Sequence, residues 1–310
     1  MTSFLSRLIR PAKANAYRIF DVQLKAIERL GPSLCRFVFT GEDVAQMTTL
    51  APDQRIKLFF PSPDGQAPSL PLHAQWQQAR RNLPPAQTPP MRTYTLRHLR
   101  REQREVDVDF VLHGVNGPAS TWATHARVGD RLQMVAPNLA YDGDPGGYEW
   151  KPPQNARKVL LVGDETALPA IAGILEQLAD TRPQLSVEAF IEVPLEPDCL
   201  ALRHSPATRL HWLPRDLLRS GHGQGMLHAV RELATLPSLR ARGAVELEEV
   251  DIDQRILWEL ASSQATEFHA WVAGESATVM EIRRYLIKER GLERESLTLM
   301  GYWRAGRSFE

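Results

Sequence analysis

The segment that most constrains the fold is a continuous apolar run near the middle of the 310-residue chain, Lys158-Val159-Leu160-Leu161-Val162-Gly163. An uninterrupted run of this kind is typical of a parallel strand that is buried on both faces. Strand-like and helix-like segments alternate after it, which is the pattern of an open α/β sheet. We therefore predict further strands at 186–192, 209–213, 267–273 and 296–302, and helices at 167–179, 225–235 and 277–289.

The chain before this run follows a different pattern, with a period of two residues. Val106, Val108, Phe110 and Leu112 alternate with their neighbours, as the side chains of a half-buried strand do. Further strands are predicted at 34–39, 55–60 and 131–135, with a short helix at 118–126. Residues 138–155 are rich in Gly, Pro, Asn and Asp, a composition typical of a linker.

These patterns predict an antiparallel β-barrel in residues 1–150, followed by a doubly wound parallel sheet in residues 151–310. The length of the chain agrees with two domains, because single domains seldom grow this large. Two segments, 61–90 and 236–256, are interpreted as insertions, the first with a helical turn at 74–81.

Composition excludes several functional classes. Residues 1–150 hold 18 Lys and Arg against 14 Asp and Glu, so a charge of +4 there balances −4 in the remainder, and nothing indicates a nucleic acid as partner. Cys35 and Cys199 are too few for a disulfide framework or a Cys-ligated cluster, and the nine His show no metal-ligand spacing. No apolar run could span a membrane and no signal peptide is evident, so we expect a cytoplasmic protein that does not insert into membranes.

Four residues on one predicted strand, Arg92-Thr93-Tyr94-Thr95, form the first candidate site. On a strand, Arg92 and Tyr94 share one face, while Thr93 and Thr95 share the other. Such a strand can present a guanidinium to a phosphate, an aromatic ring to a flat ligand and a hydroxyl close by. An ordinary half-exposed strand would also explain these residues when they are taken alone.

A predicted helix start follows about 25 residues later, at Gly117-Pro118-Ala119-Ser120. Small residues leave the backbone N–H groups approachable, and the N-terminus of a helix receives phosphate well. A serine that caps an ordinary helix is the alternative. An Arg-bearing strand followed by such a helix start is nevertheless the arrangement that a pyrophosphate requires.

The loop after the apolar run, Gly163-Asp164-Glu165-Thr166, lies at the carboxyl end of a strand, where open α/β sheets bind ligands. Two acids stand where most dinucleotide sites carry glycines, and their charge would repel a phosphate. Capping of the following helix is the alternative role for them. A second glycine-rich segment, 221–225, has no strand immediately before it and is interpreted as a flexible connection.

Together these segments resemble the siderophore-interacting, FAD-dependent ferric-siderophore reductases, a branch of the ferredoxin-reductase-like flavoproteins. The resemblance spans residues 17–306 and rests on segments that occur in order, at 92–95, 108–114, 117–119, 163–171, 271–275 and 301–306. Each segment alone is weak evidence, but the combination is specific.

The resemblance implies an FAD site in the first domain. Arg92 would pair with the pyrophosphate, Tyr94 would lie against the isoalloxazine ring, and the Thr95 hydroxyl or backbone would reach its N5 side. The phosphates and the adenosine would be lined by a strand end and a helix start: Val111, His113, Gly117, Ala119 and Ser120. The residues closest to the chemistry would be Tyr94, Thr95 and Thr166.

The resemblance also implies a nicotinamide side and an acceptor side. Asp164 and Thr166 would face the flavin from the second domain, with Thr166 nearest the ring. The strand end at Gly274-Glu275 would border the nicotinamide nucleotide. Lys57 and Arg304 match positions where basic residues attract an anionic ferric siderophore, although two solvated surface cations would look the same in the sequence.

The predicted function is the reduction of Fe(III) in a siderophore by NADPH or NADH through FAD, which releases iron because Fe(II) binds hard oxygen ligands less well. A ferredoxin is another electron donor that the sequence leaves open. The alternatives are a flavin-dependent reductase of another acceptor (ferredoxin, free flavin or a quinone) and a flavin- or siderophore-binding protein without turnover. No metal held by protein side chains is expected.

Overall fold

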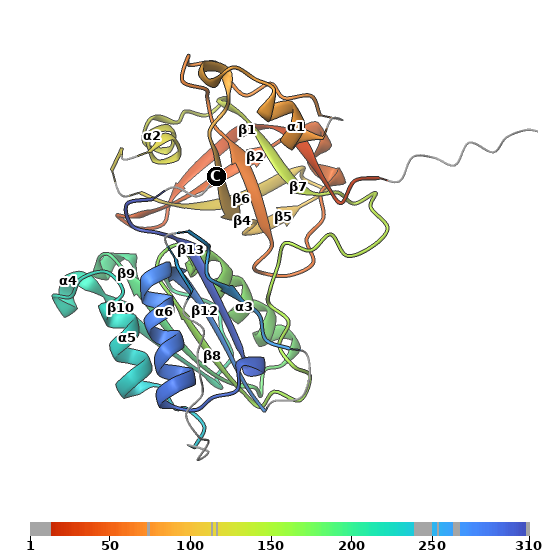
Figure 1. The fold of residues 1–310 in the computed structure, drawn as a ribbon. Coiled ribbons are helices and arrows are strands. Elements are labelled where there is room, and N and C mark those ends of the chain that lie inside the picture. The colour runs from red at the N-terminus through yellow and green to blue at the C-terminus, as the bar shows by residue number, and fades with distance from the viewer. Residues whose placement is uncertain are drawn as a thin grey trace, which may run out of the picture.

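The computed structural model describes residues 14–72, 75–112, 114–115, 117–238, 250–252, 254–262 and 267–307. These residues form two β-sheets, one above the other in Figure 1, each with its own helices and apolar core. No helix in the described ranges is long and apolar enough to cross a membrane.

The first sheet has seven strands that pair antiparallel in the order β4-β3-β7-β1-β2-β6-β5. They are β1 (Tyr17–Arg29), β2 (Leu34–Thr40), β3 (Arg55–Phe59), β4 (Met91–Thr95), β5 (His98–Arg100), β6 (Glu105–Val111) and β7 (Arg131–Pro137). The sheet curls, so that Tyr94 of β4 stacks on Phe110 of β6 with 4.2 Å between ring centroids. α2 (Pro118–His125) packs against the core inside the curl, and α1 (Trp76–Arg81) packs on a smaller cluster at Phe59.

The second sheet has six strands in the order β10-β9-β8-β12-β13-β11. They are β8 (Lys158–Gly163), β9 (Ser186–Val193), β10 (Thr208–Pro214), β11 (Trp258–Glu259), β12 (Phe268–Glu275) and β13 (Leu297–Trp303). All neighbours are parallel except the short edge strand β11, which runs antiparallel to β13.

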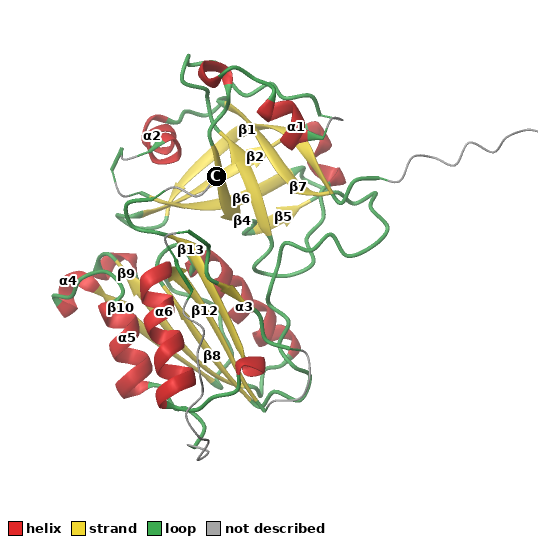
Figure 2. Cartoon of the chain, viewed as in Figure 1, coloured by secondary structure: helices red, strands yellow, loops and turns green. Residues whose placement is uncertain are grey.

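Helices cover both faces of the second sheet (Figure 2). Val159 and Leu161 of β8 pack in the cluster with α3 (Leu168–Thr181), whereas Leu160 and Val162 pack in the cluster with α5 (Gln224–His228) and α6 (Ser276–Arg284). Successive side chains of a strand point to opposite faces, so a strand covered on both sides must be apolar at every position. The prediction that the run at 158–163 is a buried parallel strand is therefore confirmed.

The order of the strands creates a switch point in the second sheet. From β8 the chain moves outward through β9 to β10, and it then returns to the other side of β8 to form β12 and β13. Connections leave the carboxyl ends of β8 and β12 in opposite directions, and ligands of doubly wound sheets bind at this edge.

The two sheets are joined largely through α3. Arg97, just after β4, donates hydrogen bonds of 2.9 and 2.5 Å to the carboxylate of Glu176 in α3. A Cβ placed on Gly173 would lie 2.9 Å from Cβ of Pro52, so this helix packs closely on the first sheet. Farther along the seam, the Ser33 N–H donates to Asp198 at 2.8 Å.

The predicted fold class, an antiparallel β unit followed by a doubly wound α/β unit, is confirmed. The first unit is a curled half-barrel whose end strands β4 and β5 do not pair with each other in the described residues. The helices expected at 225–235 and 277–289 finish in π-helical turns, Ala229–Leu233 and Tyr285–Glu289. α4 (Arg215–Leu218), β11 and 3₁₀ turns at Glu42–Gln46, Pro85–Gln87, Glu196–Asp198 and Arg294–Ser296 are too short for periodicity to reveal. The insertion expected at 236–256 lies largely outside the described residues.

Candidate functional site

The inner face of β4 carries the first two candidate residues. Arg92 and Tyr94 pair across the sheet with Leu58 and Ile56, which are buried in the core of the curl, so all four side chains share that face. Burial raises the pKa of the Tyr94 phenol above its usual range. Arg92 is half-buried, and its Nη1 donates to the Met91 carbonyl at 2.7 Å.

The outer face of β4 carries the hydroxyls. Lys57 Nζ donates to Thr93 Oγ1 at 3.2 Å, and burial, with help from Arg55 and Arg80, lowers the Lys57 pKa. Thr95 is buried and pairs with Arg55. Lys57 and Thr95 therefore lie on the opposite side of the sheet from Arg92 and Tyr94.

The start of α2 is open. The Ala119 and Ser120 N–H groups precede the first helical hydrogen bond, from Thr121 N to the Gly117 carbonyl (2.8 Å). Among the described residues, a Cβ built on Gly117 would meet only Ser120 Oγ, at 4.0 Å, so these residues leave space in front of the N–H groups. Ser120 Oγ accepts from Gly117 N at 3.1 Å, which means that the capping role considered for this serine is also present.

α2 and β4 lie close to each other. Trp122 of α2 and Tyr94 both pack on Phe110, with ring centroids at 5.9 and 4.2 Å. A guanidinium, an aromatic ring and an open helix N-terminus thus belong to one end of the curl. Val111 is placed differently: it pairs with Leu34 and packs against the core shared with α3. His113 lies outside the described residues.

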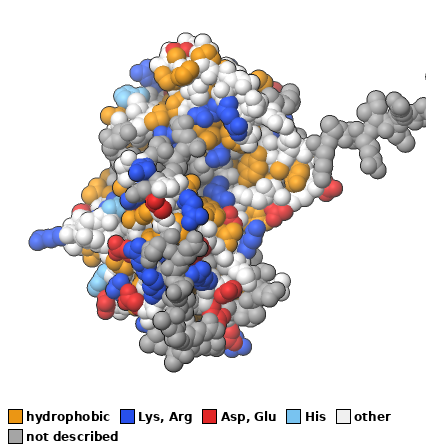
Figure 3. Space-filling model, viewed as in Figure 1, with side chains coloured by type: hydrophobic (Ala, Val, Ile, Leu, Met, Phe, Trp, Pro, Cys, Tyr) orange, Lys and Arg blue, Asp and Glu red, His pale blue; other side chains and the backbone are white. Residues whose placement is uncertain are grey.

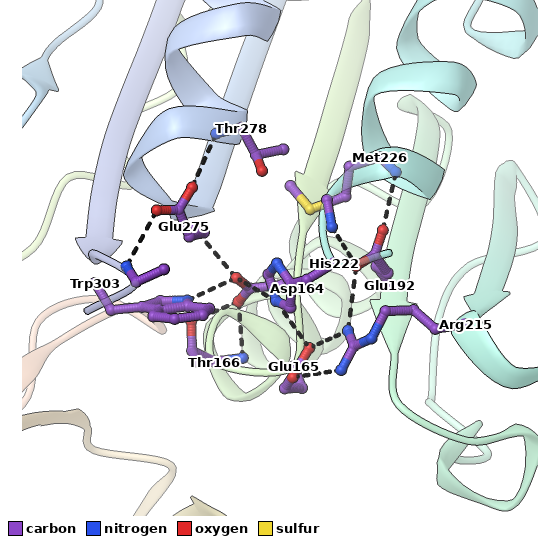
Figure 4. A network of polar contacts seen from close by, with 12 residues as sticks. Asp164, Glu165, Thr166, Glu192, Arg215, His222, Met226, Glu275, Thr278 and Trp303 are labelled. Carbon is purple, nitrogen blue, oxygen red and sulfur yellow. Dashed lines mark hydrogen bonds and ion pairs between the residues drawn. The ribbon is translucent and has the colours of Figure 1, made fainter. Parts of the chain in front are cut away.

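The acidic loop after β8 forms a dense polar network at the switch point (Figure 4). Asp164 is fully buried, and one of its oxygens accepts from Thr166 N and Oγ1 at 2.9 and 2.5 Å. Its other oxygen accepts from Glu275 N at 3.0 Å and from Trp303 Nε1 at 2.9 Å. Burial, together with the charge of Glu165, raises the pKa of Asp164 to about 6.

Glu275 is the second acid of this network. One carboxylate oxygen accepts from the Ala277 and Thr278 N–H groups at 2.6 and 3.1 Å and so caps α6. The other accepts from Arg304 Nη1 at 2.9 Å and from Ala305 N at 3.2 Å. Burial raises the pKa of Glu275, but the Arg304 contact and the backbone donors outweigh it, and the pKa falls below its usual value. Arg304, expected at the acceptor site, is therefore paired with a carboxylate.

Gly274 brings the two acids together. Its φ of +156° is unfavourable for other residues, and an added Cβ would lie 2.7 Å from an Asp164 oxygen. The structure thus gathers four of the predicted residues: Asp164, Thr166, Gly274 and Glu275.

Sequence analysis missed the ion pairs on the other side of the switch point. Arg215, just after β10, makes a bidentate contact with Glu165, with both N–O distances at 2.8 Å, and reaches Glu192 of β9 at 3.1 Å. Burial alone would raise the Glu165 pKa, but Arg215 and His222 outweigh it and lower the pKa to about 2. His222 Nε2 lies 3.6 Å from Asp164 and 3.7 Å from Glu165.

The glycine-rich segment at 221–225 is anchored, and the prediction of a flexible connection is wrong. Glu192 is fully buried and accepts from Gly223 N at 2.7 Å and from Met226 N at 3.2 Å. The signal available in the sequence was Glu192 itself, which with Glu188 is one of two acids in a strand that the structure buries.

Tyr302 of β13 links the two regions. Its pKa is raised first by burial and then by Asp53 of the first unit, with further influence from Arg55 and Asp164. Its hydroxyl is buried without a hydrogen-bond partner in the described part of the chain. Tyr302 stacks on Trp258 with 6.2 Å between ring centroids, and the Arg55 guanidinium of β3 lies 4.4 Å from the centroid of the Trp258 ring, so the first unit and β13 meet at Trp258.

Charge is unevenly distributed over this arrangement. On the face in Figure 3, Asp and Glu side chains gather mainly over the half that holds the second sheet. Among the described residues, no group of three or more His, Cys, Asp or Glu side chains is placed to hold a metal ion.

Comparison with known proteins decides the family. Residues 23–141 match the siderophore-interacting FAD-binding domain, and residues 156–306 match the siderophore-interacting protein profile. The chain belongs to the siderophore-interacting protein family. The predicted family and the predicted FAD cofactor are confirmed by these matches.

Relatives of this siderophore-interacting protein cover between 65% and 93% of its length. An uncharacterised protein of Mycobacterium tuberculosis is 32% identical, covering 93% of this chain and 91% of the relative. The ferric vibriobactin reductase ViuB of Vibrio cholerae is 27% identical, covering 90% and 86%. The NADPH-dependent ferric-chelate reductase of Escherichia coli is 29% identical, covering 65% and 74%.

Solved structures of siderophore-interacting proteins share the fold of this chain. The siderophore-interacting protein SipS from Aeromonas hydrophila superposes with a TM-score of 0.66 at 28% identity, covering 94% of each chain. A siderophore utilization protein from T. fusca gives 0.72 at 27% identity, covering 96% of each chain. A ferredoxin reductase at 15% identity and a TM-score of 0.57, covering 93% of this chain and 70% of its own, shares the fold.

Proposed function

We propose that this siderophore-interacting protein is a cytoplasmic reductase that passes electrons from NADPH or NADH through FAD to Fe(III) in a siderophore. Ferric reductases among its relatives, ViuB and the ferric-chelate reductase, support this assignment. The structural observation that carries it is the contact of the FAD-binding unit with the second sheet at Trp258, where Arg55 of β3 and Tyr302 of β13 lie against the same ring, close to the switch-point strands.

The residues of the first unit fit FAD. Arg92 and the open N–H groups of Ala119 and Ser120 would hold the pyrophosphate, because guanidinium groups and helix starts both favour phosphate. Gly117 leaves room for its approach. The adenosine side would be lined by Val111 and His113, whose roles stay predictions.

Tyr94 would shield one side of the isoalloxazine. The backbone of Thr95, whose side chain lies on the opposite face of β4, and Thr166 would border its reactive part from the two units. Bound FAD would supply two-electron uptake and single-electron delivery, which no side chain in the described residues can supply. The task of this chain is then to bind, orient and exclude water.

The donor side would lie at the switch point, bordered by Asp164, Gly274 and Glu275. The name of the Escherichia coli relative supports NADPH as donor. The relatives described above give no support for ferredoxin in that role. A negatively charged edge predicts weak nucleotide binding, since Asp164 and Glu165 oppose the charge of a phosphate.

The acceptor site is proposed at Lys57 and Arg304. Lys57 contacts only a neutral hydroxyl among the partners that the structure shows, so its charge can attract an anion. Arg304 is already neutralised by Glu275 and should contribute less. Iron would enter and leave as substrate, held by the siderophore.

Anaerobic spectroscopy tests the proposal. The purified protein should be yellow, lose its flavin absorbance with NADPH or NADH, and regain it with a ferric siderophore while a chromogenic Fe(II) chelator records iron release. Bleaching without reoxidation by any ferric siderophore would instead indicate a reductase of another acceptor, such as a quinone or free flavin. Absence of bleaching with both nucleotides would favour a binding protein without turnover.

A further inference from the structure

Three buried carboxylates occupy the backbone N–H groups at the switch-point edge. Asp164 accepts from the N–H groups of Thr166 and Glu275. Glu192 and Glu275 do the same at the starts of α5 and α6. In open α/β sheets such N–H groups usually receive a ligand phosphate, so at this edge the phosphate must find another partner.

Arg215 is positioned to be that partner. Its two Nη atoms hold Glu165 with distances of 2.8 Å each, the same parallel fork that a guanidinium makes with a phosphate. The contact with Glu192 at 3.1 Å fixes the guanidinium independently of Glu165. Arg215 would therefore stay in place if Glu165 moved away.

The loop beside this pair holds two further polar atoms without a close partner. Ser220 Oγ is buried and has no hydrogen-bond partner among the residues that the structure describes, and His222 Nε2 makes only long contacts, 3.6 Å to Asp164 and 3.7 Å to Glu165. Such atoms are costly unless something satisfies them. A phosphate on Arg215 could accept from both.

We propose that Glu165 is an internal stand-in for a phosphate, and that a phosphate of the nicotinamide nucleotide binds by displacing Glu165 from Arg215. This inference rests on the proposed function, because it assumes that the donor is a nicotinamide nucleotide. In this proposal Glu165 is the residue that sets nucleotide affinity, while Asp164 stabilises the loop by accepting hydrogen bonds from its backbone N–H groups.

Calorimetric titration of the oxidised, FAD-loaded protein with NADP⁺, NAD⁺ and 2′-AMP tests the proposal without turnover. Glu165→Gln keeps the shape of the side chain but removes the negative charge that holds the Arg215 guanidinium. At least one nucleotide should therefore bind about tenfold more tightly. Arg215→Ala should cost little in the wild type, where Glu165 already competes, but should abolish the gain in the Glu165→Gln background. Glu289→Gln, which removes an exposed carboxylate paired with Arg231, should change nothing.

Comparison of the three nucleotides identifies which phosphate binds Arg215. A gain shared by NADP⁺ and NAD⁺ assigns the pyrophosphate to Arg215, and a gain limited to NADP⁺ and 2′-AMP assigns the 2′-phosphate. Unchanged or weaker binding to folded Glu165→Gln overturns the proposal, as does an equal effect of Arg215→Ala in both backgrounds. If Glu165→Gln fails to fold, Glu165→Asp should give a smaller gain in the same direction, and no gain there counts against the proposal.

The proposed function can be checked separately. Protein that is reduced photochemically needs no nucleotide, and it should still reduce a ferric siderophore. Ferric reduction without any effect of Glu165 on nucleotide binding would reject the role of Glu165 and leave the proposed function standing.

Discussion

The two candidate regions of this protein are built on opposite principles. At the β4–α2 end of the first unit, a helix start is open and Gly117 leaves space in front of it. At the switch point of the second unit, buried carboxylates already satisfy the N–H groups and the cations. The first, open region can bind an anionic cofactor tightly. The second, closed region favours a ligand that binds weakly and dissociates readily.

The largest effect should come from the open region. Arg92→Ala removes a charge-assisted contact and should weaken FAD binding by roughly 1.5–3 kcal/mol, about ten- to a hundredfold. Calorimetry on apoprotein measures this. Arg131→Ala, which removes an exposed arginine from β7, is the matched control and should bind FAD normally. Normal FAD affinity in Arg92→Ala would remove the basis for an open phosphate site on β4.

Two glycines sharpen the comparison. Gly274→Ala should lower the free energy of unfolding by about 1–3 kcal/mol, because φ is +156° there and the new Cβ would lie 2.7 Å from Asp164. Gly117→Ala should cost less than about 0.5 kcal/mol, since its φ of −171° suits any residue and the space is open. The same methyl group should nevertheless weaken FAD binding.

Urea unfolding measures the stability of both glycine variants, and titration measures their FAD affinity. The expected pattern is a crossover, with one variant losing stability and the other losing cofactor. Equal stability losses would mean that the two regions do not differ as the structure indicates.

The Glu165–Arg215 pair should stabilise the closed region at neutral pH. Burial raises the Glu165 pKa but the ion pair lowers it to about 2, from 4.5 in an unfolded chain. A lowered pKa means that the stabilisation is complete above pH 4.5 and is lost as the pH falls toward 2. Glu165→Gln should therefore cost about 1–3 kcal/mol at pH 7 and progressively less in acid.

Unfolding curves of the wild type and of Glu165→Gln between neutral pH and the acid limit of folding check this slope. Glu289→Gln again serves as the control, because its ion pair is exposed and such pairs contribute little. A constant difference between wild type and Glu165→Gln at all pH values would show that the carboxylate is not held as an ion pair.

The sequence predicted the open region better than the closed one, for a physical reason. The strand 92–95 and the helix start at 117–120 are local patterns, and periodicity and capping rules reveal them within a few residues. The alternating fold was likewise visible in the apolar run at 158–163. Asp164 and Glu275 could be flagged because each follows a predicted strand.

The closed region depends on contacts between distant residues. Arg215 is 50 residues from Glu165 in the chain, and Glu192 holds Gly223 across 31. No local rule selects these pairs, since an arginine after a strand usually meets solvent. The placement of Lys57 and Arg92 on opposite faces depends on the register of β3 with β4, which the sequence alone did not supply.

The smallest expected effect concerns the acceptor, and it asks whether the outer face of β3, on the opposite side of the sheet from Arg92, steers substrate. Lys57→Ala should lower kcat/KM for an anionic ferric catecholate by a few-fold, because such steering is long-range and is screened over about 8 Å at physiological salt. Arg304→Ala should do less, since Glu275 already neutralises Arg304. A neutral ferric hydroxamate should be reduced at nearly the same rate by all variants, and added salt should slow the wild type only with the anionic substrate. Flavin reduction by the nucleotide is the internal control, because that half-reaction does not use the acceptor. Equal losses with both siderophores would give Lys57 a structural role through its contact with Thr93, and no loss with either would move the acceptor away from this face of β3.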